Sequence, residues 1–221
     1  MFEDNHLLAI DKPAGLPTMG APRGRVSAVE LAKAYLKRKY DKPGNVYIGV
    51  VSRLDATVSG VLLLARTSKA AARLNEQFKS GTVEKTYWAL VSGNPEPAGE
   101  LADYLLKDEA AERMRIVAAG RPGAKLAALH YRRIAAVADD AALLEIQLLT
   151  GRKHQIRVQL ASRGWPILGD KKYGSSAEFP KGIALQSRRL VFDHPTQRTR
   201  VELKSPLPIY WRRWVDEKTL N

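Results

Sequence analysis

The chain has 221 residues, of which 45% are hydrophobic, and this size suffices for one large domain or two small ones with a real core. It contains no cysteine, which excludes disulfides, a thiolate nucleophile and cysteine-ligated metal centres. Its 36 lysine and arginine residues outnumber 23 acidic residues and give a formal net charge of +13, which favours a polyanion such as nucleic acid as the partner.

The positive charge is concentrated in the last part of the chain. Residues 152–213 contain 14 basic and 4 acidic residues and so carry most of the excess. A generically basic soluble protein is the alternative interpretation, and net charge alone does not exclude it. No run of 18 apolar residues is present, and the N-terminus lacks the basic-then-apolar pattern of a signal peptide. We therefore expect a cytoplasmic protein that does not associate with a membrane.

The first predicted elements are a short strand and a basic helix. Residues 7–10 form an apolar run that stops at a turn marked by Pro13 and a nearby glycine. Ser27 stands three residues before Glu30, which is the spacing of a capping box, and apolar residues follow at helical intervals. The sequence therefore predicts a helix from Ser27 that ends before Pro43.

A polar turn with one carboxylate follows, between two apolar runs at residues 46–51 and 61–65. Runs of this length that are rich in Val, Ile and Leu predict buried strands. The turn spans residues 52–60 and holds Asp55, which we expect where one buried strand ends. Carboxylates that a rigid scaffold places at strand ends are common in active sites, whereas an aspartate near glycine often only hydrogen-bonds its own backbone. The turn by itself leaves both interpretations open.

The remaining elements mix helices with hairpins. We expect Ser68 to cap a helix over residues 69–79, with Gly81 just past its end. Strands are predicted over residues 82–91, 100–108 and 113–117. Residues 125–137 and 142–150 are predicted to form the two strands of one hairpin, joined through Asp139 and Asp140. Residues 183–192 and 199–203 are predicted to form a second hairpin. A short helix is expected over residues 206–215. This order of elements favours an α+β class with a largely antiparallel sheet.

One more helix is predicted over residues 151–161, ahead of Gly164. His154 and Arg157 are three residues apart in it and project from one face. The four histidines of the chain have no metal-ligand spacing, so we expect no metal site. The common glycine-rich nucleotide motifs and the G-x-S-x-G hydrolase motif are absent. What remains is a carboxylate at a strand end, basic side chains to meet it, and a surface suited to a polyanion.

Three ordered motifs resemble those of the RluA family of pseudouridine synthases. They are Arg53-Leu54-Asp55-x-x-x-Ser59-Gly60, Lys85-Thr86-Tyr87-Trp88-Ala89-Leu90-Val91 and Thr150-Gly151-Arg152-Lys153-His154-Gln155-Ile156-Arg157. Further segments are also similar to that family: Asp11-Lys12-Pro13-Ala14-Gly15-Leu16, Gly169-Asp170-x-x-Tyr173-Gly174 and Arg189-Leu190-x-Phe192-x-His194-Pro195. The resemblance spans about residues 7–208, and three motifs in this order are highly specific.

The resemblance implies a fold and an activity. The fold is an α+β pseudouridine synthase fold, in which a large, mostly antiparallel mixed sheet with flanking helices carries a central active-site cleft. Residues 1–221 are expected to form a single catalytic domain, without the S4 RNA-binding domain that relatives often carry, and to act as a monomer. The activity is the isomerisation of specific uridines in ribosomal or transfer RNA to pseudouridine, which requires no metal and no organic cofactor.

The resemblance also implies roles for individual residues. Asp55 is the nucleophile, attacking either the ribose or the uracil ring, Tyr87 stacks on the flipped base, and Arg157 pairs with Asp55. Arg53 resembles a residue that in some relatives fills the space left by the base. The basic residues expected along the cleft, where they meet phosphates of the RNA, are Arg152, Lys153 and His154.

Two positions depart from the family pattern, and two other functions stay open. Ser52 stands where the family usually has histidine, and Val58 where it usually has threonine. Neither carries the nucleophile, so these departures bear on turn hydrogen bonds and substrate preference more than on activity. One alternative function is an RNA-binding or ribosome-assembly factor that has lost catalysis, against which the intact motifs argue. The other is a uridine nucleosidase, which needs a second carboxylate that these motifs lack and which releases free uracil.

Overall fold

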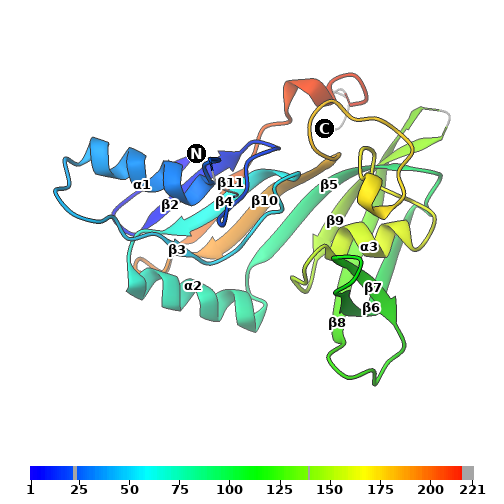
Figure 1. The fold of residues 1–221 in the computed structure, drawn as a ribbon, viewed down its shortest axis with the longest axis horizontal. Coiled ribbons are helices and arrows are strands. Elements are labelled where there is room, and N and C mark those ends of the chain that lie inside the picture. Colours follow the sequence, from blue (N-terminus) through cyan, green and yellow to red (C-terminus); the bar gives the residue numbers. More distant parts are fainter. Residues whose placement is uncertain (22–23, 139, 216–221) are drawn as a thin grey trace. The chain divides into compact units, whose positions relative to one another are not determined.

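The computed structural model describes residues 1–21, 24–138 and 140–215. The chain packs into two compact units, which Figure 1 draws as a ribbon. The first unit contains residues 1–84 and 187–206, and the second contains residues 85–186 and the segment that begins at Leu207. This division does not test the single catalytic domain expected over residues 1–221, which stays a prediction.

The first unit is built on antiparallel strand pairs. Its strands are β1 (Phe2–Glu3), β2 (Leu7–Lys12), β3 (Gly49–Val50), β4 (Ser59–Ala65), β10 (Leu185–Asp193) and β11 (Arg200–Lys204). β2 pairs with β1 and β4, β3 also pairs with β4, and β11 pairs with β10. The β10–β11 pair confirms the predicted second hairpin. In the strand order, β10 lies next to β4, which places β4 in the interior of this unit.

Helices cover both faces of the β2–β4 pair, which is why every residue of β4 is buried (Figure 1). Successive side chains of a strand point to opposite faces. On one face, Leu63 of β4 packs with Leu74 of α2 (Ser68–Ser80) in a shared apolar core. On the other face, Ile10 of β2 lies across a groove from α1 (Ala28–Lys39).

Both helices of the first unit begin at side-chain caps. α1 has the predicted capping box, because the Ser27 hydroxyl oxygen accepts from the Glu30 amide and the Glu30 carboxylate accepts from the Ser27 amide. The cap of α2 is Thr67 rather than Ser68, because the Thr67 hydroxyl oxygen accepts from the Ala70 amide at 3.2 Å. α2 ends, as predicted, at a glycine in the left-handed conformation.

The second unit is an antiparallel array with one α-helix packed on it (Figure 1). In spatial order its strands are β5 (Glu84–Ser92), β9 (Ala141–Leu148), β8 (Lys125–Ala138), β6 (Ala98–Asp108) and β7 (Arg113–Val117). Each pairs with the next in antiparallel register, which confirms the β8–β9 hairpin; Asp139 of its turn lies outside the described residues. Val158 of α3 (Gln155–Ala161) packs with Leu105 of β6 and Ala127 of β8.

Three predicted elements are wrong in extent. The apolar run at residues 46–51 forms a strand only over β3. The helix predicted over residues 151–161 begins only at Gln155. The helix predicted over residues 206–215 is a short 3-10 helix, Ile209–Trp211. The α+β class, with largely antiparallel strands and flanking helices, is nevertheless confirmed.

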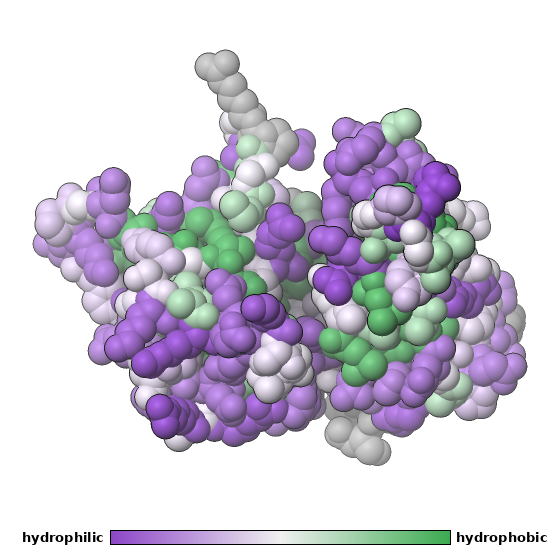
Figure 2. Space-filling model, turned by 90° about the horizontal axis from the view of Figure 1, so that it is seen from below, coloured by the Kyte–Doolittle hydropathy of each residue, from purple (hydrophilic) through white to green (hydrophobic). Residues whose placement is uncertain are grey.

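The surface agrees with the charged composition. On the face drawn in Figure 2, hydrophilic residues predominate and hydrophobic residues form smaller patches. No helix within the described ranges has the length and the apolar character that a bilayer crossing requires.

Candidate active site

Asp55 lies half-buried in the loop between β3 and β4. The loop closes as a turn in which the Val58 amide donates to the Asp55 carbonyl oxygen at 3.1 Å. Gly60, the second residue of β4, has a φ of 108°, and a Cβ atom there would clash with the Ser187 carbonyl oxygen of β10. Only glycine combines that backbone conformation with so close an approach. The Ser-Gly end of the motif therefore fixes where the Asp55 loop enters the sheet.

Lys12 is a fully buried cation beside this loop, with 0% of its surface exposed. Its ammonium donates to the carbonyl oxygens of Pro13 at 3.0 Å, Leu16 at 2.7 Å and Ala56 at 3.3 Å. Burial lowers the pKa of Lys12 from 10.5 to about 8, and the negative charge of Asp55 opposes that shift. Lys12 thus places positive charge next to the candidate nucleophile. Sequence reasoning quoted its motif but assigned it no role, because nothing local marks a lysine as buried.

Tyr87 lies on β5, where Ile146 of β9 is its cross-strand partner, and its side chain is half-buried. Two residues earlier on the same strand, Lys85 is buried, and burial lowers the pKa of its ammonium. A half-buried tyrosine on a strand is compatible with sheet packing as well as with stacking on a base. The stacking role of Tyr87 therefore stays a prediction.

Arg157 projects from α3 into a buried ion pair. Its Nε and Nη2 atoms donate to the two carboxylate oxygens of Asp170 at 2.7 and 2.8 Å, and the two side chains are 7% and 1% exposed. The guanidinium also lies over the ring of Tyr173, 5.0 Å from its centroid. A two-point contact fixes the plane of the guanidinium, and the carboxylate offsets the cost of burying the cation. Sequence reasoning singled out Arg157 but not this partner, which lies in another of the family-like segments.

His154 precedes α3 in the left-handed conformation, with a φ of 52°, and so is not the helical residue that was predicted. Its Nδ1 lies 2.8 Å from the hydroxyl oxygen of Tyr173, which accepts from the Met114 amide at 2.9 Å. The Tyr173 hydroxyl therefore joins His154 to the backbone of Met114 on β7. His154 and Arg157 do come together, as predicted, but through Tyr173 rather than through a shared helix face.

The other basic residues expected to bind RNA are exposed. Arg53 belongs to the Asp55 loop in the first unit, and Arg152 and Lys153 precede α3 in the second. The Arg152 Nε donates to the Leu126 carbonyl oxygen at 2.9 Å, which holds this side chain against β8. These positions do not test the predicted contacts with RNA or the predicted central cleft, which stay predictions.

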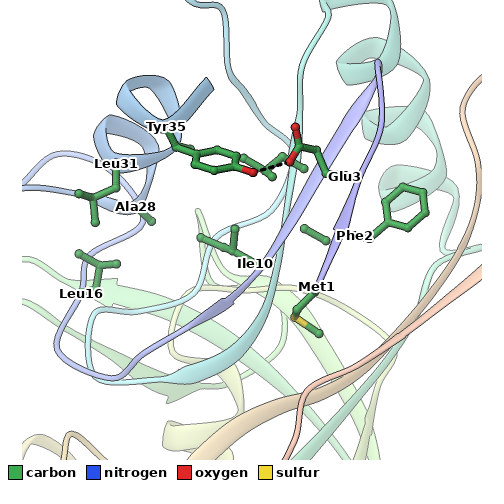
Figure 3. A pocket seen from close by; sticks show the side chains of 11 residues that line it. Met1, Phe2, Glu3, Ile10, Leu16, Ala28, Leu31 and Tyr35 are labelled. Carbon is green, nitrogen blue, oxygen red and sulfur yellow. Dashed lines mark hydrogen bonds between the residues drawn. The ribbon is translucent and has the colours of Figure 1, made fainter. Parts of the chain in front are cut away.

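A separate cavity of about 450 Å³ lies in the first unit between β1, β2 and α1 (Figure 3). Its lining is mostly apolar, with Ile10 and Leu31 on its two sides, and the Tyr35 hydroxyl donates to the Glu3 carboxylate at 2.8 Å. None of the predicted site residues, all of which are described, lines this cavity. Among the described residues, no group of three histidine, aspartate or glutamate side chains is placed to hold a metal ion.

Comparison with known sequences identifies the family. The family model described as RNA pseudouridylate synthase matches residues 6–162. Ribosomal large subunit pseudouridine synthase C of Rickettsia bellii is 32% identical over 216 residues, which cover 96% of this chain and 69% of that protein. Ribosomal large subunit pseudouridine synthase D of Zymomonas mobilis subsp. mobilis is 34% identical over 220 residues, which cover 94% of this chain and 68% of that protein.

Solved structures show the same fold. The human protein RNA Pseudouridylate Synthase Domain Containing 4 matches with a TM-score of 0.79 and 25% identity, over 96% of this chain and 91% of that one. The human protein RNA Pseudouridylate Synthase Domain Containing 1 matches with a TM-score of 0.74 and 24% identity, over 96% of this chain and 86% of that one. The predicted pseudouridine synthase fold is therefore confirmed. The chain belongs to the RNA pseudouridylate synthase family, as its resemblance to the RluA enzymes predicted, and is an isomerase that acts on RNA.

Proposed function

We propose that this enzyme isomerises uridines of ribosomal RNA and that Asp55 is its nucleophile. The names of the two relatives described above, both ribosomal large subunit synthases, favour ribosomal RNA over transfer RNA. The observation that carries the role of Asp55 is its placement: a half-buried carboxylate in the family motif, on a loop that contacts the buried cation Lys12. The enzyme acts as a monomer in the cytoplasm, without a metal ion.

The reaction needs one carboxylate and no water. The bond between N1 of uracil and C1′ of the ribose breaks, the base turns, and C5 forms the new bond to C1′. C5 then loses its proton and N1 gains one, so that product and substrate have the same composition. The carboxylate of Asp55 attacks in its ionised form and is released unchanged. A hydrolase that transfers the ribose to water instead requires a second carboxyl group, which protonates the leaving base and activates the attacking water.

Tyr87 and Arg157 complete the proposed catalytic set. A uridine in structured RNA leaves its stack to reach the carboxylate, at a cost of about a few kcal/mol, and stacking on Tyr87 offsets part of that cost. Arg157 meets the carboxylate of Asp55. The two-point pair with Asp170 fixes the plane of the guanidinium and so orients this arginine.

The proposed RNA contacts lie beside these residues in the sequence. Arg152 and Lys153 are exposed ahead of α3 and bind backbone phosphates. His154 follows them in the sequence and is held in place by its hydrogen bond to Tyr173. Arg53, exposed in the Asp55 loop, occupies the space that the flipped uridine leaves.

The deciding experiment compares Asp55→Asn with wild type on transcribed fragments of ribosomal RNA, with pseudouridine detected by chemical labelling. Asp55→Asn forms no pseudouridine, while its RNA dissociation constant stays within about two-fold, because phosphate contacts supply most of the affinity. Asp41→Asn, an exposed aspartate just after α1, is the matched control and keeps activity. Turnover by Asp55→Asn refutes the nucleophile, and release of free uracil by wild type identifies a nucleosidase.

A further inference from the structure

The side chain of Thr18 is bonded to the backbone of the residue that precedes Asp55. Its hydroxyl donates to the Leu54 carbonyl oxygen at 2.8 Å and accepts from the Leu54 amide at 3.1 Å. Thr18 is 4% exposed and Leu54 is 8% exposed, so water does not compete for these groups. A hydroxyl can donate and accept at the same time, and here one side chain serves both backbone groups of a single residue.

These two bonds replace a strand partner. Leu54 lies outside β3 and β4, so pairing between strands does not supply hydrogen-bond partners for its amide and carbonyl groups. Buried backbone groups are nearly always paired, because leaving them without a partner is costly. Two bonds to the same residue also fix its orientation, whereas a single bond allows rotation. Thr18 therefore sets both the position and the direction of the chain as it enters Asp55.

The segment that carries Thr18 is itself tied to α1. The carbonyl oxygen of Thr18 accepts from the Val29 amide at 3.1 Å, and that of Pro17 accepts from the Ala28 amide at 2.9 Å. Amides in the first turn of a helix have no partner within the helix, so these bonds also satisfy donors of α1. Thr18 thus transmits the fixed position of a packed helix to the loop.

The residue that follows Asp55 is held by the same segment. The Gly15 amide donates to the Ala56 carbonyl oxygen at 2.7 Å, and the Lys12 ammonium donates to it as well. Both chain neighbours of Asp55 are therefore fixed from residues 12–18, one by main-chain and lysine contacts and the other by the side chain of Thr18. Of these contacts, the two hydrogen bonds of the Thr18 hydroxyl can be removed by the substitution that changes side-chain shape least.

We propose that Thr18 is a positioning residue for Asp55, which it aims at the target uridine through Leu54. The inference rests on the proposed role of Asp55 as nucleophile. Misplacing a reacting group by about 1 Å costs about 100-fold in rate, even when binding is unaffected. Loss of the Thr18 hydroxyl therefore slows the chemical step and leaves RNA affinity unchanged.

The test compares Thr18→Val with Thr18→Ser. Valine has nearly the same shape but no hydroxyl, and serine keeps the hydroxyl. Thr67→Val, which removes the cap of α2 in the same unit, is the control for a general loss of stability. Each variant is assayed for the single-turnover rate at saturating RNA, for the RNA dissociation constant, and for amide hydrogen exchange at Leu54.

We expect Thr18→Val to lose about 100-fold in rate with an unchanged dissociation constant, and Thr18→Ser to stay within about three-fold of wild type. The Leu54 amide exchanges faster with solvent in Thr18→Val but not in Thr67→Val. Thr67→Val also keeps the wild-type single-turnover rate. If Thr18→Val does not fold, Thr18→Ala takes its place, and its single-turnover rate must then be about ten-fold or more below that of Thr18→Ser.

A folded Thr18→Val at the wild-type rate overturns the proposal, as does a rate loss that Thr67→Val shares. An unchanged rate of Leu54 amide exchange in Thr18→Val overturns it as well. These outcomes are distinct from failure of the proposed function. If Asp55→Asn is active, the nucleophile is wrong whatever Thr18 does, whereas an inactive Asp55→Asn beside a fully active Thr18→Val refutes the positioning role alone.

Discussion

Replacing Lys12 with methionine removes a buried charge and leaves a side chain of similar length. In the folded protein burial lowers the pKa of Lys12 from 10.5 to about 8. The unfolded chain, in which Lys12 is solvated, keeps the ordinary value of 10.5. Between these two values the unfolded state binds more protons than the folded state, so the free energy of unfolding rises with pH across this window. Below it, the cost of the buried charge is present in full.

The size of the effect follows from the shift. A change from 10.5 to about 8 corresponds to about 3 kcal/mol. Wild type should therefore gain up to about 3 kcal/mol in free energy of unfolding relative to Lys12→Met as the pH rises from 8 to 10.5. The comparison with the variant cancels the titration of other groups, because both proteins share them.

Urea unfolding of both proteins at a series of pH values measures this difference. Lys33→Met, an exposed lysine of α1, provides the baseline for the loss of a lysine that is not buried. A difference between wild type and Lys12→Met that stays constant from neutral pH to pH 10.5 would refute the reasoning. Lys12 would then titrate in the same way in the folded and unfolded states, and its ammonium would not be a charge kept in the interior beside Asp55.

Three further predictions concern the motifs. Gly60→Ala should lower the free energy of unfolding by about 3 kcal/mol in urea titrations, because a Cβ atom at this position clashes with the backbone of β10. Gly120 also has a positive φ but has open space around it, so Gly120→Ala should lower the free energy of unfolding by less. Tyr87→Ala should lower the single-turnover rate more than RNA affinity, because stacking of one base is worth about 1–3 kcal/mol. If this variant kept the wild-type rate, the role of Tyr87 would be packing in the sheet rather than stacking on the base. Arg157→Lys should lower the rate even at saturating RNA, because an ammonium cannot keep the two-point contact with Asp170. If Arg157 only bound phosphate, saturating RNA would restore the rate.

Local signals were sufficient for much of the fold. The capping box at Ser27 and Glu30 and the alternating strands of the two hairpins each depend on residues close in sequence, and each is present as predicted. The helix over residues 151–161 was wrong because its first residues have helix-compatible side chains but a different backbone. His154 takes a positive φ and bonds to Tyr173, a contact 19 residues away that no local pattern reveals.

Burial and strand formation are separate properties, and the run at residues 46–51 shows the difference. Val46 and Val51 are buried, as an apolar run predicts. Only Gly49 and Val50 meet a partner strand, at Ala65 and Leu64 of β4, so only they form β3. A sequence pattern reports that side chains avoid water, but it does not report whether the backbone finds a neighbouring strand.

The motifs identified the candidate catalytic residues without revealing what holds them. The family resemblance assigns the chemistry to Asp55 and Arg157, so their positions stood out in the sequence. Lys12 and Thr18 contact the Asp55 loop across 44 and 36 residues of chain, and Asp170 meets Arg157 across 13. Such supporting residues depend on tertiary packing, which spacing and periodicity do not encode.

The departure from the family pattern at position 58 can now be interpreted physically. Val58 is 3% exposed, so an apolar side chain suits its surroundings. The hydrogen bond that closes the turn comes from the Val58 backbone amide to the Asp55 carbonyl oxygen, and any residue other than proline makes it. Replacing threonine with valine therefore keeps this bond. With Leu54 and Ala56 held from residues 12–18, the position of Asp55 does not depend on a hydroxyl at position 58.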